Sequence, residues 1–295
     1  MISTLEAFRH YQSIIEPMLD AAPQQFIPQV ESGTSVQVER GLVILGSNDP
    51  SFVERLIELS DPRRLATLTI TDASGHHRPV YRALLVYCWL KAFQAQYETL
   101  ARSEFGRWEE SVRAWCDFLE QELGQIDWSV GAMPAKRGSS ATEAAWMALA
   151  LFVAGKIFVR DAWTDLAADT FGRFAKRQLP DGALLQFDPS DNLETWGYHE
   201  LVTLHACASY AVQAEDRAIA GVVSRATAFH AGFTQPDHST AQPWALFAFI
   251  WNPDTRTFAD QLLHAASTSR DGMSLMLLAD ALYCLRLFTR EESQP

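Results

Sequence analysis

The densest group of chemically active side chains lies between residues 191 and 205. It comprises Asn192, Glu194, Trp196, Tyr198, His199, Glu200 and His205. Imidazole, phenol and carboxyl groups can exchange protons, and a carboxamide can stabilise a developing charge, so these residue types could support acid–base catalysis. The same side chains could instead be core groups bonded to neighbouring backbone, because buried polar groups are nearly always hydrogen-bonded. The sequence leaves both interpretations open.

Helical geometry predicts how these residues divide over faces. At about 100° per residue, Tyr198 and His205 share one face, whereas His199 faces with Glu200 on another. The two histidines are six residues apart, which does not match the zinc-binding HExxH pattern. We therefore predict no metal. The chain also has no glycine-rich phosphate or dinucleotide loop, and we predict no cofactor.

A second cluster contains His77, Arg78 and Arg82 around Pro79. Pro79 suits the first turn of a helix, so His77 and Arg78 would lie at a helix start, where an anion is favoured. Arg78 and Arg82 are four residues apart and could hold a carboxylate or phosphate together. Pairing of both arginines with surface acids is the alternative.

Other candidates are weaker. Ser140 and Glu143 have the spacing of a capping box, which predicts a helix start at Ser140. Asp237 and His238 are adjacent in a predicted turn and could join a site in space.

The elements that must position these residues are helices. Long apolar segments are expected at residues 78–94, 142–158, 194–212, 240–251 and 272–288. Amphipathic, charged segments lie between them at residues 107–123, 163–178, 217–233 and 256–266. This alternation predicts helical hairpins in which the charged helix faces water and covers the apolar one.

The first third of the chain is less regular. A helix is expected at residues 5–16, with Pro17 ending or kinking it. Residues 24–45 mix Pro, Gly and β-branched residues in a pattern typical of short strands and turns. We predict an irregular amino-terminal segment, residues 1–74, packed on a hairpin domain formed by residues 75–295.

A weak internal repeat of about fifty residues supports the hairpins. Trp146, Trp196 and Trp244 fall near the starts of successive apolar segments. The linkers before three apolar segments also resemble one another, at residues 180–182, 236–238 and 270–272.

The alternation, together with the turn at residues 178–184 (QLPDGAL), resembles the α/α-toroid superfamily. That superfamily includes squalene cyclases, prenyltransferases, alginate-lyase-like enzymes and six-hairpin glycosidases. The resemblance implies an all-α toroid with a cavity lined by the starts of the inner helices. Its expected catalytic residues are Tyr198, His199, Asn192 and His77. Its expected substrate-binding residues are Arg78, Arg82, Trp196, Glu200, Glu194, Trp146, Trp244, Asp237 and His238.

Several functions remain open under this resemblance. The first is a carbohydrate-active or related small-molecule enzyme, such as a uronate lyase that performs β-elimination with Asn, His, Tyr and Arg side chains. A glycosidase would need two carboxylates across the cavity, and Glu143, Asp191, Glu194, Glu200 and Asp237 could supply them. The alternatives are a non-catalytic helical scaffold or binding module, and a terpenoid-cyclase-like protein that lacks the acidic motif.

Composition restricts the partners. The 295-residue chain has 24 basic and 36 acidic residues, a net charge of −12, which disfavours nucleic acid. We expect a small-molecule or oligosaccharide ligand. Four widely spaced cysteines in apolar stretches favour reduced thiols and a cytoplasmic location. No secretory signal is recognisable, and no run of about 18 uncharged apolar residues predicts a membrane span.

Overall fold

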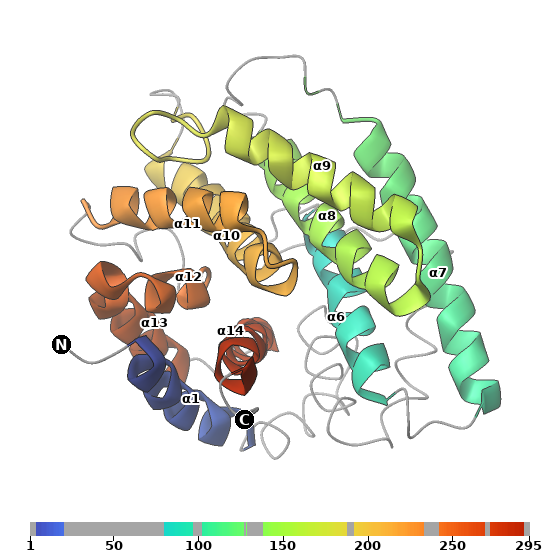
Figure 1. Ribbon diagram of the computed structural model, residues 1–295, viewed down its shortest axis with the longest axis horizontal. Coiled ribbons are helices and arrows are strands. Elements are labelled where there is room, and N and C mark those ends of the chain that lie inside the picture. Colours follow the sequence, from blue (N-terminus) through green and yellow to red (C-terminus); the bar gives the residue numbers. More distant parts are fainter. Residues whose placement is uncertain are drawn as a thin grey trace. The chain divides into compact units, whose positions relative to one another are not determined.

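The computed structural model describes residues 4–20, 80–96, 102–126, 128, 138–187, 192–232, 242–268 and 272–291 (Figure 1). The regular elements in these ranges are helices, with no strand, so the predicted all-α class is confirmed. The short extended pieces predicted within residues 24–45 lie outside the described residues, as does the predicted domain boundary at residue 74.

The predicted alternation of apolar and amphipathic helices is also confirmed. The apolar helices are α6 (Val80–Gln96), α8 (Gly138–Phe158), α10 (Leu193–Gln213), α12 (Leu246–Trp251) and α14 (Gly272–Glu291). The amphipathic helices are α7 (Arg102–Gly124), α9 (Asp161–Arg177), α11 (Arg217–His230) and α13 (Arg256–Thr268), with a short 3₁₀ turn, η3 (Pro253–Thr255), before α13. Helix α12 is shorter than predicted, because Ala245 has left-handed backbone (φ 57°) and the helix begins only after it.

Helix α1 (Thr4–Asp20) excludes one of the two outcomes predicted at Pro17, an end of the helix there. The helix continues through Pro17 for three further residues. A proline inside a helix removes one backbone hydrogen bond, but Leu19 in the last turn is buried, and its burial favours the continued helix.

The start of α8 corrects the predicted capping box. The helix begins at Gly138, so Ser140 lies in its first turn and Glu143 further inside. Within the described residues, α8 also contains the one stretch, Ala141–Phe158, long and apolar enough to cross a membrane. That stretch is 78% buried inside the structure, as is usual for a core helix.

The contacts divide the chain into two compact units. One contains residues 24–128 and 143–170, and therefore α6, α7 and most of α8 and α9. Its core is rich in aromatic residues: Trp89 meets Trp115 edge to face at 4.3 Å, and Phe93 meets Trp108 at 5.3 Å. Such pairs add to the stabilisation from buried area.

The other unit contains residues 1–23, 129–142 and 171–295. Helices α10 and α11 pack side by side in it, and α1 lies against α14 (Figure 1). From Trp196 to Val212, every residue of α10 except His199 is buried. This helix carries most of the candidate site, so its polar side chains must find partners in neighbouring segments.

Candidate functional site

The amino-terminal end of α10 is capped by Asn192. Its side-chain oxygen accepts a hydrogen bond from the backbone N–H of Glu194 at 2.9 Å. Both side chains are exposed. The structure therefore gives Asn192, which was predicted to be catalytic, a capping role that is common at helix starts.

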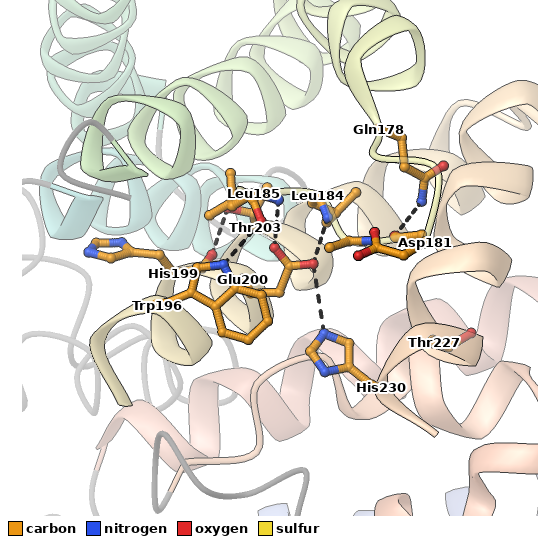
Figure 2. A network of polar contacts seen from close by, with 12 residues as sticks. Gln178, Asp181, Leu184, Leu185, Trp196, His199, Glu200, Thr203, Thr227 and His230 are labelled. Carbon is orange, nitrogen blue, oxygen red and sulfur yellow. Dashed lines mark hydrogen bonds and ion pairs between the residues drawn. The ribbon is translucent and has the colours of Figure 1, made fainter. Parts of the chain in front are cut away.

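Glu200 joins α10 to residues 178–187, which connect α9 to α10. Its two carboxylate oxygens accept hydrogen bonds from the backbone N–H groups of Leu184 (2.7 Å) and Leu185 (2.8 Å) (Figure 2). One turn earlier on α10, the Trp196 indole N–H donates to the backbone oxygen of Leu185 at 3.0 Å. The predicted substrate-binding residues Trp196 and Glu200 thus lie together, and both bind the chain's own backbone.

The environment of Glu200 favours its neutral form. The side chain is fully buried, and the loss of water raises the pKa of its carboxyl group to about 8. The two backbone hydrogen bonds act in the opposite direction, and the negative charge of Asp181 adds to the increase. His230 on α11 lies beside it, with Nε2 3.8 Å from Oε1 of Glu200.

His199 belongs to a different cluster. Its Nδ1 lies 3.2 Å from the hydroxyl of Thr142, which is also 3.1 Å from the hydroxyl of Thr203. Figure 2 shows the imidazole pointing away from the Glu200 carboxylate. The prediction that His199 faces with Glu200 is therefore wrong, because His199 lies beside Thr142 whereas Glu200 binds the backbone of Leu184 and Leu185.

Tyr198, His205 and Trp244 form an aromatic cluster. The rings of Tyr198 and His205 meet the Trp244 ring edge to face, at 6.1 and 5.8 Å. The predicted shared face of Tyr198 and His205 is therefore confirmed. Tyr198 also meets His199 edge to face at 5.2 Å. Tyr198 and Trp244 are both buried, so the indole is part of the core.

His205 anchors a buried polar cluster between α10 and α14. Its Nδ1 accepts the backbone N–H of Ala245 (3.1 Å), so its proton is on Nε2, which donates to Oδ2 of Asp280 at 3.1 Å. The Ser209 hydroxyl donates to the same oxygen at 2.8 Å. In a catalytic triad histidine lies between serine and acid. Here the acid lies between the other two, so the arrangement does not activate the serine.

The remaining predicted residues are distributed elsewhere. Trp146 is fully buried and meets Tyr87 edge to face at 5.6 Å, so it is a core residue of its own unit. Arg82 interacts electrostatically with Glu143 in that unit. His77, Arg78, Asp237 and His238 lie outside the described residues, as does Asp191.

Among the described side chains, no three His, Cys, Asp or Glu residues are placed to bind a metal ion. The four cysteines are buried and free, as expected of thiols that pack as small apolar groups.

Three partners of the α10 residues were missed by the sequence interpretation: Asp280, His230 and Thr142. Asp280 had a usable signal, because it is the one charged residue between positions 273 and 285 of an otherwise apolar segment. A lone acid on a buried helix requires a polar partner. Neither His230 nor Thr142 has a comparable signal in the sequence.

Comparison with known proteins identifies no relative. No family model, no curated protein and no solved structure matches the chain significantly.

Proposed function

We propose that the chain is a non-catalytic helical scaffold or binding module, built from hairpins of the α/α-toroid type. The observation that supports this most is Glu200, whose two oxygens bind the backbone N–H groups of Leu184 and Leu185 while the side chain is fully buried. A substrate-binding carboxylate would have to exchange these bonds for a ligand. Asn192 and Trp196 likewise bind the chain's own backbone.

The second candidate is an enzyme acting on a carbohydrate or related small molecule, such as a uronate lyase. One observation favours it: the Tyr198 and His199 rings lie 5.2 Å apart near the start of α10, and His199 is partly exposed. A phenol and an imidazole could serve as acid and base in β-elimination.

Two variants distinguish these functions. For a non-catalytic scaffold or binding module, H199A and Y198F each lower Tm by about 2–4 °C per kcal/mol of lost stability, and the wild-type protein turns over none of the compounds screened. H264A, which removes an exposed histidine of α13, is the matched control and should leave Tm unchanged.

The measurement is a thermal-shift screen with uronates, oligosaccharides and isoprenoid phosphates, because a ligand of the native state raises its Tm. The scaffold proposal is overturned if one of these compounds stabilises the wild-type protein and is turned over, and if H199A or Y198F loses the turnover while keeping the wild-type Tm.

A further inference from the structure

Residues 178–187 combine buried apolar side chains, those of Ala183, Leu184 and Leu185, with a set of polar contacts to α10 and α11. The Gln178 side chain donates to the backbone oxygens of Gly182 (2.8 Å) and Val222 (2.9 Å), and it accepts a bond from Nε of Arg225 at 2.7 Å. These contacts hold the beginning of the segment on α11. Glu200 holds its centre, through the backbone N–H groups of Leu184 and Leu185 (Figure 2).

Glu200 and His230 approach each other beneath this segment from two different helices. Both side chains are fully buried, and Nε2 of His230 lies 3.8 Å from Oε1 of Glu200. The imidazole also meets Phe249 of α12 edge to face at 6.0 Å. The two groups therefore share largely apolar surroundings, where an unbalanced charge is costly.

The described titratable groups around Glu200 come from three elements. Asp181 belongs to residues 178–187 and its charge raises the pKa of Glu200. His230 comes from α11. Cys207 lies on α10 itself, and burial together with Glu200 raises the pKa of its thiol, which stays neutral. From α12 the contact is the uncharged Phe249.

We propose that Glu200 and His230 form a proton-dependent latch. With one proton between them the pair is neutral overall, and it fixes residues 178–187 to α10 and α11. Removal of that proton leaves a net negative charge in the core and favours detachment of the segment. The segment precedes α10 in the chain and is bound to it through Glu200, so the latch would act on the helix that carries Tyr198 and His199.

The direction of the pH dependence follows from counting the protons that the closed latch and the open latch each hold. The closed pair keeps its proton up to about pH 8, where burial has moved the pKa of Glu200 from its ordinary 4.5. In the open state, a solvated imidazole loses its proton near pH 6.5 and a carboxyl well below that. Between about pH 6.5 and 8 the closed latch therefore holds one proton more than the open one, and closure weakens as pH rises.

Amide hydrogen exchange at Leu184 and Leu185, corrected for the intrinsic pH dependence, tests the latch. We expect protection of these two amides to be constant from about pH 5 to 6.5. It should then fall up to about tenfold per pH unit and level off above about pH 8. Protection that is constant from pH 5 to 9 in the wild-type protein would overturn the proposal.

Two variants assign the proton. In E200Q the decrease in protection of the Leu184 and Leu185 amides above pH 6.5 should disappear. In H230F, which retains an aromatic ring beside Phe249, the fall should begin near pH 5, because the open state no longer takes up a proton on the imidazole. A fall that persists in E200Q, or one that still begins near pH 6.5 in H230F, would exclude the pair.

E215Q is the matched control. Glu215 is exposed in the turn between α10 and α11, so its neutralisation should leave the profile of Leu184 and Leu185 unchanged. If E200Q does not fold, the wild-type and H230F profiles still decide, because the position of the lower break depends on His230 alone.

Discussion

Glu143 shows how the pKa of a carboxyl group depends on its surroundings. It lies on α8, and burial is the main reason that its pKa rises from 4.5 to about 7. The positive charge of Arg82 opposes the rise, and the negative charge of Glu122 adds to it. The side chain suggested a capping box and a catalytic carboxylate in the sequence. In the structure it is a partly buried acid within a helix.

The raised pKa of Glu143 predicts a pH-dependent contribution to stability. The folded protein holds this proton more tightly than the unfolded chain, so the contribution is present at low pH and is lost as pH rises through about 7. We expect E143Q to reduce the decline in unfolding free energy between pH 5 and 8, measured by urea denaturation at each pH. E110Q, at an exposed position of α7, should keep the wild-type decline; equal declines in all three proteins would refute the prediction.

Two hairpins close with the same kind of turn. Val159 follows α8 and Glu215 follows α10, both with φ of 53°. In each turn the next residue donates its backbone N–H five residues back, from Arg160 to Gly155 (3.0 Å) and from Asp216 to Ala211 (2.9 Å). This bond belongs to a left-handed helix cap, in which glycine is usual. The recurrence supports the repeat of hairpins that the tryptophan spacing suggested.

Val159 is poorly suited to its turn. Its side chain is 86% exposed, and a β-branched residue in left-handed backbone is strained. V159G should raise the unfolding free energy by about 0.5–1 kcal/mol, read from the urea midpoint. V159A removes the exposed apolar group without relieving the backbone strain, so a gain from V159A equal to that from V159G would contradict the argument.

Gly182 is required by a close approach of two segments. Its φ is 102°, and a Cβ there would lie 2.6 Å from the backbone oxygen of Arg225. G182A should therefore destabilise the protein by about 1–3 kcal/mol. G172A is the matched control: a Cβ at this position of α9 meets nothing within 4 Å, and removing a helical glycine should stabilise by about 0.5–1 kcal/mol. Similar midpoints for both variants would show that residue 182 can move away from α11.

On the scale of the whole molecule, the first and last described helices pack together within one compact unit. Helix α1 packs on α14 and on α12. The ring centroid of Phe8 lies 5.4 Å from that of Phe288 on α14 and 6.5 Å from that of Phe247 on α12. At its border Tyr11 donates a hydrogen bond to Asp260 of α13 at 2.9 Å. Helix α1 thus completes a core to which α12, α13 and α14 contribute.

This long-range packing predicts a large effect from a single residue. F8A should lower the unfolding free energy by about 3–5 kcal/mol, because Phe8 is buried against two helices. I14A changes the same helix at an exposed position and should cost less than about 1 kcal/mol. A loss from F8A no greater than that from I14A, in urea denaturation, would mean that α1 does not complete this core.

The sequence was sufficient for the helices and their alternation, because a helix that is apolar on every side must be covered and an amphipathic one must do the covering. It also placed Tyr198 and His205 on one face, since helical period alone determines that. It left open whether Pro17 ends or kinks its helix, and the helix continues past Pro17 to a last turn where Leu19 is buried. It was wrong about the direction of His199, whose imidazole lies beside the hydroxyl of Thr142.

Only the tertiary structure decided what the polar residues of α10 do. Periodicity shows which side chains share a face, but the partner opposite that face comes from a distant part of the chain. Glu200 meets the backbone of Leu184 and Leu185, and His205 meets Asp280, seventy-five residues further on. Whether a buried carboxylate binds a ligand or the protein itself depends on these partners, and such partners are fixed by packing.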